Sequence, residues 1–205
     1  MNALFLVPRG AEAAAVRRAG GRVVEIPAGA RAAQALPDVL AGERIIVTGL
    51  CGALAALPVQ TVVVYEAAVD DDRWFSCDAS LGAVLSRAQR VVGFTSPHIV
   101  TSAFEKRILA ERTGAHVVDM EGTPLAAALG ARGIRFAMVR VVSDDAHRDL
   151  PPIDSAIDAH GTLRPERLAF AFARRPFAAV RFIRESLRAL RSLERTAREI
   201  IALPG

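Results

Sequence analysis

Two short segments carry the residue types most able to do chemistry, and each follows an apolar run. The first is Asp119-Met120-Glu121 and the second is Ser143-Asp144. A carboxylate such as Glu121 can accept hydrogen bonds from two hydroxyl groups at once, as recognition of a sugar diol requires. A carboxyl group in a poorly solvated cleft, here Asp144, can hold a proton and donate it to a leaving group.

Each segment also has an interpretation without chemistry. Acidic residues near the N-terminus of a helix are favoured by the helix dipole, so Glu121 also suits a helix start. Asp144 also suits the capping of a surface loop. Either residue alone favours the plainer interpretation, and the occurrence of the two segments together favours a functional site.

The elements that would position these residues alternate between apolar strands and helices. Strands are expected at 3–7, 22–26, 44–48, 61–69, 90–94, 115–118 and 136–142, and helices at 11–19, 30–40, 102–112 and 123–131. This alternation predicts a three-layer α/β fold with a central mixed, mostly parallel sheet flanked by helices. Ligands of such sheets gather at the carboxyl ends of strands, where both acidic segments fall.

We expect a single domain over residues 1–205, in which 151–205 is a C-terminal helical extension. Apolar residues recur every three or four positions in a long amphipathic helix: Phe177, Val180, Ile183, Leu187, Leu190, Leu193, Ala197 and Ile200. Arginines form a second stripe: Arg181, Arg184, Arg188, Arg191, Arg195 and Arg198. The apolar face suits docking on the domain, which we favour, but also a dimer contact or an anionic membrane surface.

Composition indicates an ordinary soluble globular protein, with 52% hydrophobic and 23% charged residues. No apolar run reaches the roughly 20 residues of a membrane-spanning helix, and the N-terminus lacks a signal peptide pattern, so we expect a cytoplasmic protein. Few aromatic residues and no nucleic-acid motif argue against nucleic-acid binding despite the net charge of +4. Neither Cys51 nor Cys77 lies in a ligand-spaced cluster, so no metal site is expected.

The segment from residue 115 to 145 resembles one known family. Its order is strand, Asp-Met-Glu-Gly, helix, Gly-Ile-Arg-Phe, strand and Arg-Val-Val-Ser-Asp. This resembles the nucleoside phosphorylase and nucleosidase superfamily, which includes purine nucleoside phosphorylase and methylthioadenosine/S-adenosylhomocysteine nucleosidase. The resemblance implies that Met120 packs under a ribose, Glu121 binds its 2′ and 3′ hydroxyls, Asp144 is the general acid at purine N7, and Ser143 helps to hold Asp144. The expected activity is cleavage of the N-glycosidic bond of a purine, adenosine-type nucleoside.

Two upstream loops fit the same resemblance. His98 and Ile99 fall where the family binds the base, although a histidine in this Pro-containing loop suits a capping or exposed position equally well. Gly49 and Gly52 resemble the family's glycine-containing turn, where bare backbone permits close approach of ribose and nucleophile. The serine that phosphorylases often carry in this turn is replaced by Leu50, which weakens the case for phosphate.

The nucleophile is left open between water and phosphate. Glu12 stands at the spacing of the water-activating glutamate of the family's hydrolases, whereas Arg9 suits a phosphate site. A solvent-facing glutamate at a helix start is an equally good interpretation of Glu12. No cofactor is implied, with phosphate as the one candidate co-substrate, and the family's habit of pairing subunits implies a homo-oligomer.

The C-terminal region resembles hopanoid-associated phosphorylases in Leu150-Pro-Pro152, the segment 158–163, Arg174-Arg-Pro176 and the closing Arg-rich helix. That resemblance implies adenosylhopane, a lipid-linked adenosine, as a substrate. The alternative function is a non-catalytic nucleoside-binding protein whose C-terminal helix contacts a membrane or a partner.

Overall fold

One mixed sheet lies at the centre of the protein and positions the candidate site. The structure is a computed structural model and describes residues 3–38, 43–85, 87–153 and 165–204. Its strands are β1 (Ala3–Pro8), β2 (Arg22–Ile26), β3 (Arg44–Ala53), β4 (Val62–Val69), β5 (Trp74–Ser76), β6 (Gln89–Thr95), β7 (Val117–Asp119) and β8 (Phe136–Asp144). Its helices are α1 (Ala11–Arg18), the 3-10 helix η1 (Gly29–Ala35), α2 (Leu81–Val84), α3 (Ala103–Thr113), α4 (Gly122–Ala131), α5 (Pro165–Arg174) and α6 (Pro176–Ala202).

The strands close part of the sheet into a ring. Their order is β2-β1-β3-β7-β6-β4-β5, and β8 pairs with both β3 and β4. The strands β3, β7, β6, β4 and β8 therefore form a ring, which β1 and β2 extend beyond β3. Most pairings are parallel, and β3–β7, β4–β5 and β4–β8 are antiparallel. The predicted α/β class with a mixed sheet is confirmed, but the strand pattern did not predict the ring, because periodicity does not say which strands pair.

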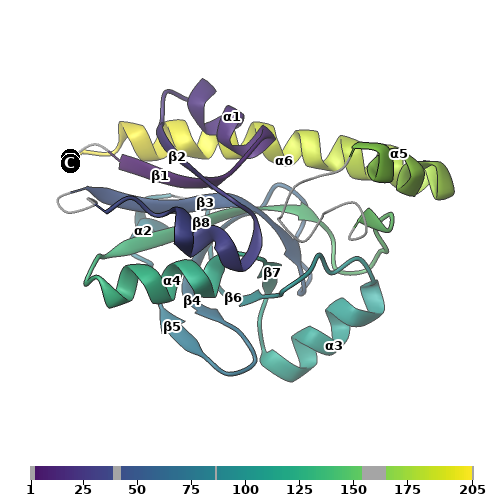
Figure 1. Ribbon diagram of the computed structural model, residues 1–205, viewed down its shortest axis with the longest axis horizontal. Coiled ribbons are helices and arrows are strands. Elements are labelled where there is room, and N and C mark those ends of the chain that lie inside the picture. Colours follow the sequence, from purple (N-terminus) through teal and green to yellow (C-terminus); the bar gives the residue numbers. More distant parts are fainter. Residues whose placement is uncertain (1–2, 39–42, 86, 154–164, 205) are drawn as a thin grey trace.

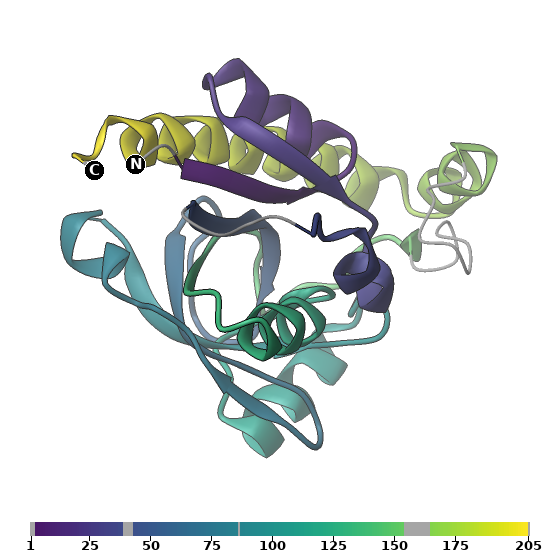
Figure 2. The same ribbon diagram turned by 60° about the vertical axis from the view of Figure 1, so that its left-hand side comes forward.

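Helices cover the sheet on two sides, with α1 and α6 on one and α4 on the other (Figures 1 and 2). Alternation along β1 explains how one strand serves both layers, because successive side chains of a strand point to opposite faces. Leu4 and Leu6 pack in the core that α4 covers, whereas Phe5 and Val7 pack in the core that α1 and α6 cover. The second core holds the C-terminal half of α6 against β8 and α1.

The prediction of a single apolar face on α6 is wrong. Ala189, Leu193 and Ile200 are buried against the domain, whereas Phe177 and Val180 are 90% and 67% exposed. An α-helix turns once every 3.6 residues, so apolar residues spaced by three drift about 60° around the helix at each step. Phe177, Val180 and Ile183 therefore point away from the face that docks, whereas Ala179 in the same half is buried. Within the described residues, no helix combines the length and the apolarity needed to span a bilayer.

Two local features differ from the prediction. The Gly49–Ala53 segment, predicted as a turn, continues strand β3, and its register on β8 shifts between Cys51 and Gly52 as at a β-bulge. This strand continues because β8 pairs with it along its whole length, a partner that local sequence does not reveal. The helix expected at 30–40 is the shorter η1, and residues 39 and 40 lie outside the described part of the chain.

Candidate active site

A cavity of about 280 Å³ lies where β3, β7 and β8 end beside α1 and the N-terminal half of α6. Eight of the ten predicted site residues line it: Glu12, Gly52, His98, Ile99, Met120, Glu121, Ser143 and Asp144. The other two lie elsewhere. Gly49 is directly behind Glu12, and Arg9 is exposed and does not line the cavity.

Glu121 lines the cavity, and its carboxylate makes contacts with other parts of the fold. It sits at the N-cap position of α4, but its side chain does not cap the helix. Its Oε1 accepts a hydrogen bond of 3.1 Å from the backbone N–H of Gly29, and its Oε2 lies 3.2 Å from the guanidinium of Arg140. Burial raises the pKa of Glu121, and the charge of Arg140 opposes that shift. The side chain of Glu121 thus contacts Gly29 and Arg140 instead of capping the helix that it begins.

Arg140 is the first functional residue that the sequence reasoning missed. It is fully buried on β8, and its guanidinium also lies 3.2 Å from Oδ2 of Asp119. A third contact, of 3.5 Å, joins it to the carbonyl of Leu50. An arginine inside the apolar run Phe136–Val142 was the available signal, because a buried arginine requires carboxylate partners.

The sequence places Asp119 beside Glu121 as a second carboxylate where a ligand would bind. In the structure its oxygens accept hydrogen bonds from other parts of the protein. The hydroxyl of Tyr65 and that of Thr95 donate to it over 3.1 Å and 3.0 Å, and the N–H of Gly122 donates over 3.0 Å. With Arg140 beside it, Asp119 has a partner on every side. Asp119 and Glu121 share the guanidinium of Arg140.

Glu12 lies next to Glu121 at the end of the cavity where a nucleophile would attack. Its Oε1 accepts a hydrogen bond of 2.6 Å from the N–H of Leu50. Burial, followed by the nearby charge of Glu121, raises the pKa of Glu12 to about 7. A Cβ atom at Gly49 would lie 2.7 Å from Glu12 and 2.7 Å from Arg140, so only glycine allows both side chains to approach β3 here.

The end of the cavity around Glu121 and Glu12 therefore carries an excess of negative charge. One guanidinium, that of Arg140, faces Asp119 and Glu121, and Glu12 adds a further charge whenever it is ionised. Fixed negative charge in a cavity with little water stabilises positive charge that develops on a bound molecule. This end of the cavity suits a reaction in which a sugar becomes cationic.

Asp144 lies at the other end of the cavity, where two side chains contact its carboxylate. The hydroxyl of Ser143 donates to its Oδ1 over 2.8 Å, and the ammonium of Lys106 contacts its Oδ2. The Lys106 ammonium also donates to the carbonyl of Asp145 over 2.7 Å. A Cβ atom at Gly52 would lie 3.1 Å from Oδ2 of Asp144, so the bare backbone of β3 gives the carboxylate its place.

Lys106 is the second residue that the sequence reasoning missed. Its side chain has no solvent exposure, which is rare for lysine. It shares the buried face of α3 with Leu109, three residues further along, while Phe104 and Ile108 on the same helix are exposed. Only this spacing relative to Leu109 signalled burial, and nothing in the sequence paired Lys106 with Asp144.

The remaining cavity wall is mostly apolar. His98 is exposed at the rim, where its Nε2 lies 2.9 Å from Oε1 of Glu105, and Ile99 beside it is half-buried. Leu150, Ile153 and Phe182 complete the wall where α6 passes. The cavity thus combines a carboxylate cluster, a buried acid with its lysine, and an apolar side.

Part of the chain matches a known protein family. The model of the Phosphorylase superfamily matches residues 87–173, which is less than half of the chain. No curated protein sequence matches the chain. The resemblance to the nucleoside phosphorylase and nucleosidase superfamily that the sequence predicted is confirmed, and the match supports an enzyme that acts on a glycosidic bond.

Solved structures share the fold at low sequence identity. A protein from Borrelia burgdorferi B31 assigned as a 5′-methylthioadenosine/S-adenosylhomocysteine nucleosidase, bound to adenine, superposes with a TM-score of 0.69 at 13% identity, over 98% of this chain and 99% of that one. The corresponding nucleosidase of Helicobacter pylori gives 0.66 at 12% identity, over 95% and 96%. A futalosine hydrolase mutant of Helicobacter pylori gives 0.58 at 14% identity, over 68% and 88%.

Proposed function

We propose that this chain, with the fold of the nucleosidases and a segment that matches the Phosphorylase superfamily, hydrolyses the N-glycosidic bond of an adenosine-type nucleoside and releases the base. The observation that carries the proposal is the presence of Asp144, Glu121 and Glu12 in one cavity of about 280 Å³. An acid for the leaving group, a ligand for the ribose diol and a base for water are the three groups that this reaction needs.

The proposed mechanism assigns each group a step. Breaking the C1′–N9 bond leaves positive charge on the sugar and negative charge on the base. Asp144 delivers a proton to N7, which makes the base a better leaving group, and the carboxylates around Arg140 stabilise the sugar cation. Glu12 takes a proton from a water molecule that attacks C1′, and its pKa of about 7 suits a base at neutral pH.

Water is favoured over phosphate by the distribution of positive charge. A phosphate site needs cations or N–H groups that are free to bind an anion. Arg140 and Lys106, the two fully buried cations at this site, are already bound to carboxylates, and Arg9 lies outside the cavity wall. In addition, Leu50 offers an apolar side chain where a phosphorylase has a serine.

The direct test is release of adenine from adenosine and 5′-methylthioadenosine, followed by chromatography, in buffer free of phosphate and in buffer with phosphate. We expect release without phosphate and ribose as the sugar product. Strict dependence on phosphate and a sugar phosphate product would overturn hydrolysis in favour of phosphorolysis. Nucleoside binding without release from any substrate would favour the alternative of a non-catalytic binder.

We further propose that the 5′ substituent is apolar, with adenosylhopane as the candidate that the C-terminal resemblance suggests. Leu150, Ile153 and Phe182 form an apolar wall on the side of the cavity next to α6. Apolar walls favour apolar substituents by about 0.8 kcal/mol for each buried CH₂ group. We therefore expect kcat/KM to rise from adenosine to 5′-alkylthioadenosines of increasing chain length, and a flat series would contradict this substrate class.

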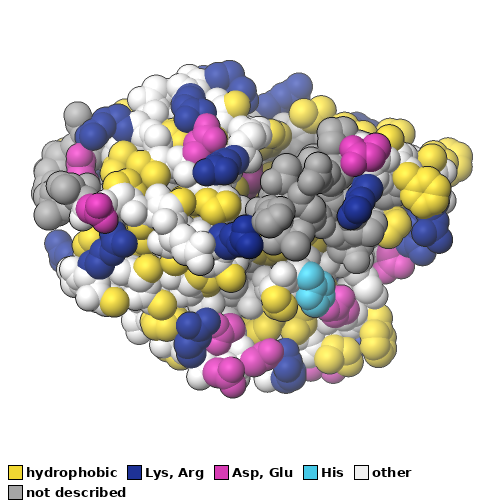
Figure 3. All heavy atoms as spheres, in the orientation of Figure 1, with side chains coloured by type: hydrophobic (Ala, Val, Ile, Leu, Met, Phe, Trp, Pro, Cys, Tyr) yellow, Lys and Arg dark blue, Asp and Glu magenta, His cyan; other side chains and the backbone are white. Residues whose placement is uncertain are grey.

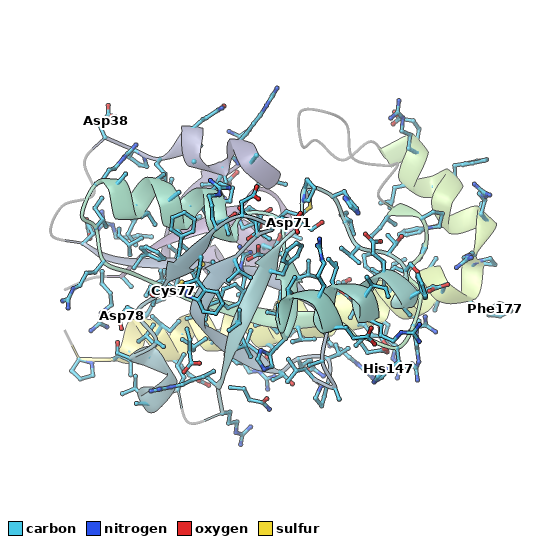
Figure 4. The ribbon with its side chains drawn as sticks, turned by 90° about the horizontal axis from the view of Figure 1, so that it is seen from below. Asp38, Asp71, Cys77, Asp78, His147 and Phe177 are labelled. Carbon is cyan, nitrogen blue, oxygen red and sulfur yellow. The ribbon has the colours of Figure 1, made fainter. Side chains whose placement is uncertain are left out.

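The outer half of α6 is proposed to contact an anionic membrane surface. Phe177 and Val180 are exposed beside the exposed Arg184 and Arg188, and Figure 4 shows Phe177 at the outer end of the fold. Figure 3 shows hydrophobic and basic side chains next to one another at the same end of the molecule. Such a surface binds anionic bilayers through both kinds of side chain.

Co-sedimentation with vesicles tests the membrane contact. We expect binding to phosphatidylcholine vesicles that contain phosphatidylglycerol, and loss of binding in Phe177→Ser. Trp74→Ser, which removes an exposed aromatic residue from β5, is the matched control and should bind like the wild type. Equal binding to neutral vesicles would contradict the role of the arginines.

Analytical ultracentrifugation without vesicles tests the expected homo-oligomer.

A further inference from the structure

Lys106 occupies a position that the proposed reaction does not yet use. It is buried completely, it comes from α3, and its ammonium contacts Asp144. A buried charged lysine is tolerated only when its charge is paired, and the Asp144 carboxylate is its partner here. The carboxylate that it pairs with is the one assigned to protonate the leaving base.

The pairing creates a difficulty for Asp144 as a lone acid. Both oxygens of the Asp144 carboxylate are in use as acceptors, because the Lys106 ammonium contacts Oδ2 and the Ser143 hydroxyl donates to Oδ1 over 2.8 Å. In this geometry neither oxygen carries a proton of its own. An acid must nevertheless deliver a proton to N7 each time the glycosidic bond breaks.

We propose that Lys106 and Asp144 act together as the acid of this site, with Lys106 as a positioning residue that supplies the proton through Asp144. This inference rests on the proposed function. As the C1′–N9 bond breaks, its electron pair passes to the base, and N7 takes a proton through the Asp144 carboxyl. The Lys106 ammonium replaces that proton and becomes a neutral amine. A proton from solvent restores the ammonium after the base has left.

Three features of the site suit this step. The contact between Lys106 and Oδ2 of Asp144 provides a direct path for the proton. The carbonyl of Asp145 accepts a second hydrogen bond from Lys106, which keeps the nitrogen in place in both protonation states. The side chain of Lys106 has no solvent exposure, so bulk water does not compete with Asp144 for its proton.

Other ionisable groups near the pair do not replace it. On α3, Glu105 is engaged by His98 at the rim. The groups that face the pair from other elements are Asp145 and Asp149 in the loop after β8, Glu185 on α6 and the thiol of Cys51 on β3. Lys106 is the cation in direct contact with Asp144, so its replacement isolates the effect of the pair.

The test compares Lys106→Met with the wild type on two substrates at two pH values. Methionine fills a similar volume, carries no proton and leaves Asp144 to act alone. Adenosine needs protonation of its base, whereas 4-nitrophenyl β-D-ribofuranoside releases nitrophenolate without a proton. Near pH 8 we expect Lys106→Met to lose about 100-fold in kcat on adenosine, within the range of general-acid catalysis, and about 3-fold or less on the nitrophenyl riboside.

The pH dependence separates proton supply from structure. Near pH 5.5, Asp144 without Lys106 can carry its own proton, so the ratio of variant to wild-type rate on adenosine should recover about tenfold or more. Lys106→Arg keeps the positive charge but cannot release a proton, so it should lose activity on adenosine at both pH values. Asp144→Asn combined with Lys106→Met should be no slower than Asp144→Asn alone, because Lys106 acts only through Asp144.

The outcomes are distinct from those that test the proposed function. Absence of cleavage of either substrate by the wild-type protein contradicts the proposed function itself. Equal losses on both substrates at both pH values, or a further loss in the double variant, would overturn the role of Lys106 and leave it a structural residue. Thermal unfolding of each variant, followed by circular dichroism, verifies that the rates compare folded proteins.

Discussion

Each end of the cavity pairs a buried carboxylate with a buried cation, and the two cations differ. At the sugar end, Glu121 shares the buried Arg140 with Asp119, and at the base end Asp144 contacts the buried Lys106. A guanidinium keeps its charge under all conditions in a protein, whereas an ammonium can give up a proton. In the proposed mechanism, the sugar end therefore keeps a constant charge and the base end holds a proton that can move.

This difference matches the chemistry expected at each end. A sugar cation needs a field that stays constant through the reaction, which Arg140 and its two carboxylates provide. A departing purine needs a proton at one moment, which a carboxylate paired with arginine could not supply. The comparison predicts that changes at the base end depend on the leaving group, and that changes at the sugar end do not.

The largest effect is expected from Asp144→Asn. The amide cannot donate a proton as an acid, so hydrolysis of adenosine should fall by about 10³-fold, within the range of general-acid catalysis. The nitrophenyl riboside should be cleaved at a rate close to that of the wild type, because its leaving group needs no proton. Near-wild-type turnover of adenosine would remove Asp144 from the mechanism, whereas equal losses on both substrates would contradict the division between the two ends.

Glu12→Gln should give the next largest effect and should not depend on the leaving group. Loss of the base that activates water should slow both substrates by about 10²-fold. The pKa of Glu12 is raised to about 7, chiefly by burial, so the active ionised form increases as the pH rises through that value. The wild-type rate on the nitrophenyl riboside should therefore rise through pH 7 and level off above it.

Persistence of this rise in Glu12→Gln would assign it to another group. The nitrophenyl riboside is the substrate of choice for this profile, because the protonation of the base does not contribute to it. Asp144→Asn provides the matched control and should keep the same rise.

Whether a site residue could be predicted from the sequence depends on how far along the chain its partners lie. Each of the three carboxylates lies at or shortly after the end of a strand, so local patterns together with the family resemblance were enough to propose Glu12, Glu121 and Asp144. Arg140 and Lys106 matter because of partners that the fold brings together, Glu121 to Arg140 and Asp144 to Lys106, across 19 and 38 positions. Hydrophobic periodicity does not encode such pairs.

The same limit explains the errors in the fold. The strand nature of Gly49–Ala53 depends on pairing with β8, and the ring of strands depends on the contacts of β8 with both β3 and β4. The drift of the apolar stripe on α6 was present in the spacing of Phe177, Val180 and Ile183. These residues do not share a face with Leu193, because a spacing of three residues falls short of the 3.6 residues in a full turn.

Glu121→Gln tests the sugar end and should reduce activity less than the two preceding substitutions. A hydrogen bond to a charged group is worth about 1.5–3 kcal/mol, so loss of the charge should reduce kcat/KM by about 10- to 100-fold. The effect should be smaller on 2′-deoxyadenosine, which lacks one of the two hydroxyls. Arg140 keeps Asp119 as a partner in this variant, so the protein should still fold. An equal loss on both nucleosides would contradict recognition of the diol.

Gly52→Ala should have the smallest effect and should act only at the base end. The new Cβ atom would lie 3.1 Å from Oδ2 of Asp144, 3.2 Å from Cγ1 of Val118 and 3.4 Å from Oδ1 of Asp144, so the carboxylate and the valine must shift by a few tenths of an ångström. Small displacements of a catalytic group reduce rates measurably, and we expect about a tenfold loss on adenosine with little change on the nitrophenyl riboside. Gly130→Ala is the matched control, because no atom lies within 4 Å of the added Cβ. If Gly52→Ala slowed both substrates equally, β3 would position the sugar rather than the acid, and the two ends of the cavity would not be separable at this strand.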